Sequence, residues 1–270
     1  MPYRSVIGAV DLDKPSRHLV YHAAGMAAAA GVPLTLVSAI GPDQSSADAT
    51  SRLERLFADA VPYDVTAIPD PAFLTVHASP VEGVLEAARA RGAGLIVAGT
   101  RARGELARLL LGSASADLLQ QTDRPLLLVP PTDIDIVTMV GGRASLHFGA
   151  VLLAIDLAES NSRQHQYASA MAALARQPLL ALTVADKGGP PDRDVAAALR
   201  SAVADVGPVA PSAFIVRRGD PAQEIARAAR AEQSGLVVMG LRSERRGRPG
   251  STATAVLQSH RALVLAVPDR

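Results

Sequence analysis

The residues from Gly99 to Ser115 are the best candidates in the chain for binding an anion. Small residues stand at positions 99, 102, 104 and 112, where they let backbone N–H groups approach a ligand closely. The sequence Gly-Ser-Ala-Ser at 112–115 is expected to begin a helix, which offers unbonded amides, the positive end of the helix dipole and two hydroxyls. Positive charge nearby comes from Arg101, Arg103 and Arg108. A phosphate site is one interpretation and a surface loop with a serine N-cap is the other, and spacing alone favours neither.

Other motifs lack the residues that their chemistry requires. The Gly-x4-Gly at 99–104 resembles half of a P-loop, but Glu-Leu at 105–106 replaces the Lys-Ser/Thr pair that contacts phosphate and Mg²⁺. The Gly-Ala-Gly at 92–94 precedes a predicted strand rather than following one, which argues against a dinucleotide fingerprint. His18 and His22 could share a helix face as metal ligands, but no third ligand is evident. We therefore assign no catalytic and no metal-binding residue.

The composition narrows the class of protein. The 270 residues include 27 Lys and Arg, 26 Asp and Glu, and no cysteine. A chain without cysteine has no disulfides, thiolate metal sites or cysteine nucleophiles, and a net charge of +1 produces no broad field for nucleic acid or a membrane surface. Residues 23–42 carry no charge, but Gly-Val-Pro at 31–33 interrupts them, so a helix followed by a strand is expected rather than a membrane span. We expect a cytoplasmic globular protein without nucleic-acid or membrane partners.

The chain contains the same pattern twice. Three blocks of similarity keep their order at separations of 145, 141 and 138 residues: 9–12 with 154–157, 79–99 with 220–240, and 112–130 with 250–268. Separations that only shrink indicate two collinear copies, of which the second is the shorter. We predict one domain at residues 1–143 and another at 144–270.

Each copy alternates short apolar runs with alanine-rich amphipathic stretches. The apolar runs lack period-2 alternation, which is typical of strands buried on both faces of a parallel sheet. In the first copy we expect strands at 6–10, 34–40, 73–77, 95–98 and 126–129, and helices at 17–30, 51–60, 81–91 and 115–121. The pattern predicts an α/β fold of two open, doubly wound sheets with about five parallel strands each. Residues 131–148 are expected to form a linker with an extra edge strand at 134–140.

Ligands of doubly wound sheets bind beyond the carboxyl ends of the strands, near the switch in strand order. The expected strand ends contain Asp11, Ala39 and Gly99 in the first copy, and Asp156, Val184 and Gly240 in the second.

The chain resembles a tandem universal stress protein over nearly its whole length. Nucleotide-binding members of that family carry Gly-x2-Gly-x9-Gly-(Ser/Thr) after the fourth strand, and this chain has Gly-x2-Ala-x9-Gly-Ser at 99–113. The family's aspartate at the end of the first strand, which lies near the adenine, matches Asp11 and Asp156. The Pro-Leu-Leu-Leu-Val-Pro at 125–130 resembles the family's last strand. The resemblance implies two domains that pack as an internal pseudo-dimer.

The resemblance also implies a ligand, which is ATP or AMP, with or without Mg²⁺. The implied nucleotide-binding residues of the first copy are Asp11, Ala39, Gly99, Arg101, Ala102, Gly112, Ser113, Ala114 and Ser115. In the second copy the loop is three residues shorter and Pro249 removes one amide donor. We therefore favour nucleotide in the first copy over the second, where the corresponding residues are Asp156, Val184, Gly240, Gly250, Ser251 and Thr252.

The function that the resemblance implies is stress-response regulation rather than an enzyme with rapid turnover. We expect nucleotide binding to order residues 99–113 and so change a surface that is offered to a protein partner. One alternative is an interaction scaffold without nucleotide, because Ala102 replaces the middle glycine of the motif. Another is a slow nucleotide hydrolase, for which Asp11 is the only candidate base. A homodimer of the tandem chain is compatible with each of these.

Overall fold

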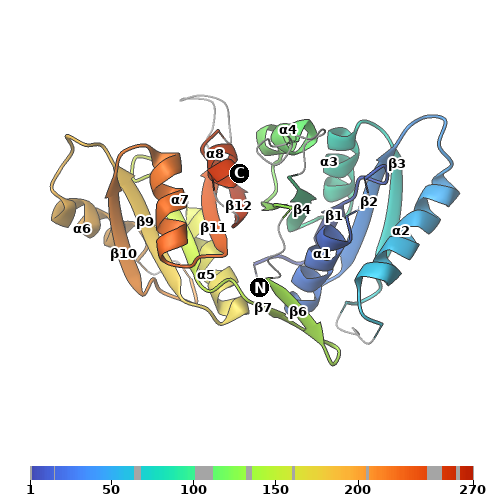
Figure 1. Cartoon of the computed structure of the whole chain (residues 1–270), viewed down its shortest axis with the longest axis horizontal. Coiled ribbons are helices and arrows are strands. Elements are labelled where there is room, and N and C mark those ends of the chain that lie inside the picture. Colours follow the sequence, from blue (N-terminus) through green and yellow to red (C-terminus); the bar gives the residue numbers. More distant parts are fainter. Residues whose placement is uncertain are drawn as a thin grey trace.

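The computed structural model describes residues 2–14, 16–63, 68–100, 112–131, 136–159, 162–204, 207–241, 251–259 and 262–269. Each copy of the repeat forms one α/β lobe, and the two lobes lie side by side with the chain termini near their junction (Figure 1). Among the described helices, none is long and apolar enough to cross a lipid bilayer.

The first copy alternates strands and helices in the predicted order. Its elements are β1 (Val6–Ala9), α1 (Arg17–Ala30), β2 (Leu34–Ile40), α2 (Ser46–Ala60), β3 (Ala72–His77), α3 (Pro80–Ala90), β4 (Leu95–Gly99), α4 (Ser113–Gln121) and β5 (Leu126–Val129). The strands pair in parallel in the order β5-β4-β1-β2-β3. The chain therefore switches direction across the sheet between β1 and β4, which is where such sheets open a ligand crevice.

The second copy repeats this topology. Its elements are β8 (Val151–Ile155), α5 (Ser162–Ala175), β9 (Leu179–Ala185), α6 (Asp192–Ala202), β10 (Ala213–Arg218), α7 (Pro221–Ala231), β11 (Leu236–Leu241), α8 (Ser251–Ser259) and β12 (Leu263–Pro268). Its strand order, β12-β11-β8-β9-β10, is equivalent to that of the first copy. The prediction of two five-stranded, parallel, doubly wound sheets is confirmed.

The two sheets join into one sheet of ten strands. The junction is an antiparallel pairing of β5 with β12, the last strand of each copy. One side-chain hydrogen bond also joins the two copies: the Tyr167 hydroxyl of α5 donates to the carbonyl oxygen of Gly94 at 3.2 Å. The copies thus pack as an internal pseudo-dimer built around a continuous sheet.

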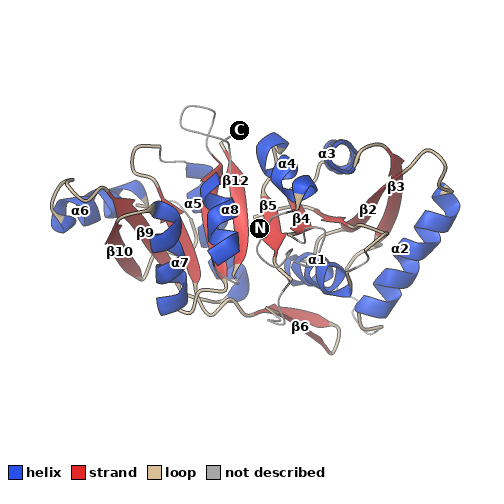
Figure 2. Cartoon of the chain, turned by 45° about the horizontal axis from the view of Figure 1, so that its top comes forward, coloured by secondary structure: helices blue, strands red, loops and turns tan. Residues whose placement is uncertain are grey.

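Helices cover both faces of the sheet (Figure 2). The core on one face contains buried residues of α1, α2, α5 and α6 and runs through both copies. The other face holds two separate clusters, one with α3 and α4 and one with α7 and α8. Small side chains allow close packing: Ala23 and Ala27 of α1 are fully buried against the sheet.

The linker contains a hairpin that the sequence prediction placed wrongly. Strands β6 (Val137–Val140) and β7 (Arg143–Leu146) pair with each other in a separate two-stranded sheet, rather than adding an edge strand to the main one. Gly141 and Gly142 both have positive φ, at 59° and 76°, as a two-residue hairpin turn requires. The hairpin packs on α1, where the backbone amide of Met139 donates to the Tyr21 hydroxyl at 3.2 Å.

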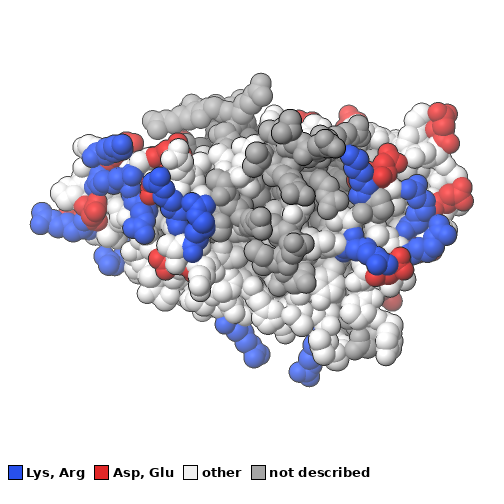
Figure 3. Space-filling view, in the orientation of Figure 1, with Lys and Arg blue, Asp and Glu red and all other residues white. Residues whose placement is uncertain are grey.

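The two copies differ in charge. Residues 1–143 contain 12 basic and 15 acidic residues, whereas residues 144–270 contain 15 and 11. On the face drawn in Figure 3, lysine and arginine side chains lie on the outer part of both copies. Acidic side chains are interspersed among the basic ones, so this face presents a mixed surface rather than a continuous basic patch.

Candidate functional site: a cavity at the ends of β1 and β4

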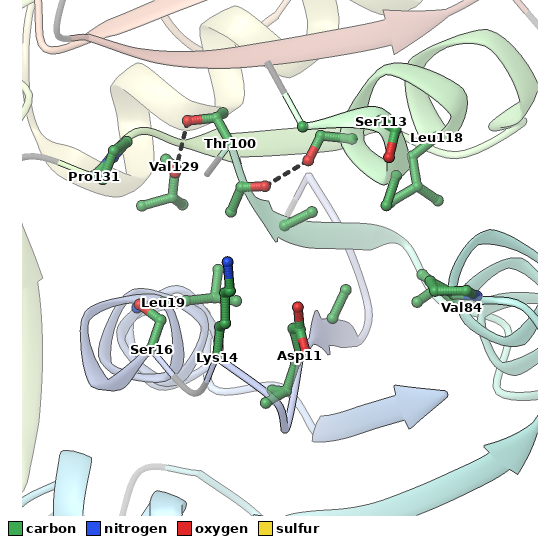
Figure 4. Close-up of a pocket in the computed structure, with 18 of the residues that line it drawn as sticks. Asp11, Lys14, Ser16, Leu19, Val84, Thr100, Ser113, Leu118, Val129 and Pro131 are labelled. Atoms are coloured by element: carbon green, nitrogen blue, oxygen red, sulfur yellow. Dashed lines mark hydrogen bonds between the residues drawn. The ribbon is translucent and has the colours of Figure 1, made fainter. Parts of the chain in front are cut away.

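A cavity of about 370 Å³ opens at the carboxyl ends of β1 and β4, the switch point of the first copy (Figure 4). Residues from the β1–α1 turn, the start of α1, the end of β4, the first turn of α4 and the segment after β5 line it. Seven of the residues predicted for the first copy are among them: Asp11, Ala39, Gly99, Gly112, Ser113, Ala114 and Ser115. The other two, Arg101 and Ala102, lie outside the described residues.

The turn between β1 and α1 forms one wall of the cavity. The Asp11 carboxylate accepts the amide of Asp13 at 2.9 Å, and the Asp11 carbonyl accepts the amide of Lys14 at 3.2 Å. Ser16 caps α1 by accepting the amide of Leu19 at 3.2 Å. These bonds fix a tight turn from which Asp11 and Lys14 point into the cavity (Figure 4).

The opposite wall joins the end of β4 to the start of α4. The Ser115 hydroxyl donates to the Gly99 carbonyl at 2.6 Å, and the Gly112 amide donates to the Thr100 carbonyl at 3.3 Å. The Thr100 amide in turn donates to the Val129 carbonyl at 3.1 Å, which ties the segment to β5. The first turn of α4 is therefore held at a defined place beside the strand ends.

The N-terminal amides of α4 lie in this wall. Gly112 is the N-cap residue and makes no side-chain cap bond, since it has no side chain. The first intrahelical hydrogen bond runs from the Ala116 amide to the Gly112 carbonyl at 2.9 Å. The amides of residues 113–115 precede that bond, so they are not satisfied within the helix and suit an anionic group.

Lys14 lines the cavity but was not among the predicted site residues. A signal was present, because Lys14 and Lys187 are the chain's two lysines and Lys14 stands only three residues after Asp11. Its ammonium group points into the cavity from the same turn as the Asp11 carboxylate (Figure 4). The described lining thus contains one lysine besides the carboxylates of Asp11 and Asp13.

Comparison with known proteins identifies the family. The model of the universal stress protein family matches residues 2–130 and, separately, residues 147–268. The chain belongs to the universal stress protein family. Because each copy of the repeat matches by itself, the chain is a tandem universal stress protein. The predicted boundary between residues 143 and 144 stays a prediction.

Solved structures share this universal stress protein fold at low sequence identity. A functionally unknown protein from Pseudomonas aeruginosa PAO1 has a TM-score of 0.70 over 99% of this chain and 93% of its own, at 18% identity. A universal stress protein from Archaeoglobus fulgidus DSM 4304 has a TM-score of 0.68 over 98% of both chains, at 17% identity. A Thermus aquaticus universal stress protein is 37% identical over 78 residues, which is 29% of this chain and 56% of that relative. This chain therefore matches about half the length of that relative.

The second universal stress protein copy places its predicted residues at equivalent positions. Asp156 forms the same turn as Asp11, since its carboxylate accepts the amide of Ala158 at 3.0 Å. The other predicted residues lie towards the end of β9 (Val184), in β11 (Gly240) and in the first turn of α8 (Ser251 and Thr252), and Gly250 lies outside the described residues.

Three described residues away from the cavity have a shifted pKa. Burial lowers the pKa of His165 in α5, and burial raises the pKa of the Tyr3 and Tyr167 hydroxyls. None of these three residues lines the cavity. His18 and His22 do share a helix face, with ring centroids 4.1 Å apart, but no group of three or more metal-ligating side chains occurs among the described residues.

Proposed function

We propose that the first copy of this tandem universal stress protein binds an adenine nucleotide, ATP or AMP, and that the protein acts as a regulator. The observation that carries this proposal is the shared cavity. The Lys14 ammonium and the N-terminal amides of α4 line the same space as the Asp11 carboxylate. A cation and a helix N-terminus suit phosphate, whereas a carboxylate accepts hydrogen bonds from ribose hydroxyls or an adenine amine.

The cavity has a suitable size and shape for this ligand. Its volume of about 370 Å³ falls within the range typical of small-molecule sites. Apolar walls come from Leu19, Val84 and Leu118, and small residues such as Ala39 and Gly99 leave room at the strand ends. A planar base fits against apolar and small side chains, so the phosphates would extend towards α4. Mg²⁺ would accompany ATP as its counter-ion, with the phosphate oxygens as its ligands.

Binding and regulation, rather than catalysis, agree best with the described residues. Catalytic acids and bases commonly show strongly perturbed pKa values, and the described residues for which a shifted pKa is resolved, Tyr3, His165 and Tyr167, do not line the cavity. A nucleotide would act on α4, because the Ser115 hydroxyl connects that helix to Gly99 at the cavity. Any difference in nucleotide affinity between two positions of α4 would shift their populations and change a surface offered to a partner protein. We place this activity in the cytoplasm.

Isothermal titration calorimetry with ATP and AMP tests the proposal, with Ser113→Asp as the informative variant. A negative charge at the first position of α4 favours the helix dipole, so the fold should survive, but it repels phosphate. We expect a loss of affinity of about tenfold or more, which corresponds to ~1.4 kcal/mol or more of binding free energy. The matched control is Ser251→Asp, the same change at the equivalent position 138 residues on, which should bind as the wild type does.

A wild-type protein that binds neither ATP nor AMP at millimolar concentration would contradict the proposal. In that case the interaction scaffold would be the better interpretation, and Ser113→Asp would be used to search for an effect on partner binding instead.

A further inference from the structure

Gln164 of the second copy stands at a position whose equivalent in the first copy lines the cavity. Leu19 and Gln164 are equivalent, 145 residues apart, and each is the third residue of its helix, α1 or α5. Leu19 lines the cavity of the first copy. Leu19 and Gln164 both pack on the sheet, but Gln164 adds a polar contact there, because its amide nitrogen donates to the carbonyl oxygen of Ala154 at 2.5 Å. Ala154 lies next to the last residue of β8, the strand equivalent to β1.

The same side chain also lies closely over β11. A Cβ atom built on Gly240 would lie 2.9 Å from the amide oxygen of Gln164, which is closer than Cβ atoms come to such atoms. At the equivalent Gly99, a Cβ atom would lie 4.0 Å from Leu19, an ordinary contact. The Gln164 amide thus spans from β8 to β11, across the switch point where the first copy has its cavity.

Burial and hydrogen bonding hold the side-chain amide of Gln164 in this position. Gln164 is only 3% exposed, and a buried amide is costly to leave without hydrogen-bond partners. A ligand that entered this crevice would have to break the bond to Ala154 and find room for a displaced polar side chain. Leu19, the equivalent residue of the first copy, has no side-chain hydrogen bond that a ligand would have to break.

The charge of the turn after the first strand also differs between the copies, and this difference too disfavours a nucleotide in the second copy. Glu159 stands at the position of Lys14, because both follow the equivalent aspartates by three residues. A carboxylate at this turn disfavours phosphate where an ammonium favours it.

We propose that Gln164 occupies the second copy's ligand site from within and so limits the chain to one nucleotide. This inference rests on the proposed function, since it concerns the same kind of site. It makes Gln164 the residue that determines which copy binds, so replacing it by the leucine of the first copy should open the second site.

Photolabelling of the full chain with 8-azido-ATP, followed by peptide mass spectrometry, tests the inference. In the wild type we expect label on first-copy peptides alone, displaced by excess ATP. In Gln164→Leu we expect label on peptides of both copies and a calorimetric stoichiometry that rises towards two. Label on the second copy of the wild type, or on the first copy alone in Gln164→Leu, would overturn the inference while leaving the proposed function intact. A wild type without displaceable label in either copy would overturn the proposed function and the inference together.

The reciprocal change gives a second test that does not require the second site to open. Leu19→Gln should weaken ATP binding by tenfold or more, whereas Leu19→Met, which has similar length but no amide, should weaken it less than threefold. Thermal melts establish that both variants fold. Equal affinities of the two folded variants would mean that the amide is not what excludes the nucleotide.

Discussion

Leu127 of β5 faces Leu265 of β12 at the centre of the antiparallel junction between the two copies. The two residues are equivalent, 138 residues apart, and their neighbours pair reciprocally, Leu126 with Ala266 and Leu128 with Val264. A residue that pairs with its own equivalent lies on a two-fold axis, so the junction has the symmetry of a homodimer interface within one chain. Both leucines are buried, at 0% and 1% exposure, and belong to the core cluster that runs through both copies.

This symmetry predicts a pair of matched substitutions. Leu127→Ala and Leu265→Ala should each lower the free energy of unfolding by ~2–5 kcal/mol, the usual cost of truncating a buried leucine. Because the two side chains face each other, the double variant should lose less than the sum of the single losses. Urea denaturation of the four proteins in the cycle measures this coupling. Strict additivity would mean that the two leucines do not share one packing site.

Much of the fold was predictable because the repeat and the apolar runs carry redundant information. The largest error in the first copy concerned α2, which begins at Ser46 rather than residue 51. The cap explains the difference, since Ser45 accepts the amide of Asp48 at 3.3 Å and so starts the helix in a polar segment that hydrophobic periodicity does not detect. The β6–β7 hairpin had its own signal in Gly141-Gly142, but the apolar run before it was interpreted alone.

The candidate site was predictable where it depends on strand ends and not where it depends on side chains from helices. Asp11, Gly99 and Ser113 follow from topology, because the carboxyl ends of neighbouring parallel strands meet at one edge of the sheet. The roles of Lys14 and Gln164 at the site could not be predicted in this way, because they depend on how far a turn or a helix directs a side chain over that edge. Residue spacing does not specify this. Comparing the two copies position by position would have marked both, since Glu159 and Leu19 are their equivalents.

Replacing Gly25 in α1 by alanine should change stability in the direction opposite to the one that helix propensity predicts. A Cβ atom on Gly25 would clash with a methyl carbon of Val137 in the linker hairpin. Gly25→Ala should therefore lower the melting temperature, although glycine to alanine inside a helix otherwise stabilises by ~1 kcal/mol. The matched control is Gly83→Ala in α3, whose Cβ would make ordinary contacts of 3.4 Å or more and should not destabilise.

The same contact predicts a rescue. Adding Val137→Ala to Gly25→Ala should restore part of the lost stability, because the smaller side chain leaves space for the new methyl group. Calorimetric melting of the single and double variants measures it. A Gly25→Ala protein as stable as the wild type would show that the hairpin does not press on α1.

His165 predicts that the protein loses stability in mild acid. Burial holds its pKa below the ordinary 6.5, so the unfolded chain binds this proton more readily than the folded one does. The free energy of unfolding should be unaffected by this residue above pH 7, and should fall as the pH drops below about 6.5. Residue 20, the equivalent position in the first copy, is valine, so His165→Val should fold and reduce this pH dependence.

Urea denaturation at pH 5.5 and pH 7.5 measures the effect. His147→Gln, a change at an exposed histidine, serves as the control and should keep the wild-type difference between the two pH values. If His165→Val and the wild type lose the same stability between pH 7.5 and pH 5.5, the buried imidazole is not the group responsible.

Lys14 predicts the charge dependence of nucleotide binding. Its ammonium points into the cavity beside the start of α4, so Lys14→Glu replaces an attraction for phosphate by a repulsion and reproduces the charge of the second copy. We expect ATP affinity to fall by about tenfold or more, and AMP affinity to fall less because AMP carries fewer charges. The loss of ATP affinity in Lys14→Glu should shrink as the salt concentration is raised from about 0.05 M to about 0.5 M, because salt screens the interaction between the side chain and the phosphates.

The control is Lys187→Glu, which makes the same charge change at the chain's other lysine, exposed after β9 in the second copy. If both variants bound ATP with equal affinity, the effect of Lys14 would be one of net charge, and the phosphates would have to lie away from the β1–α1 turn.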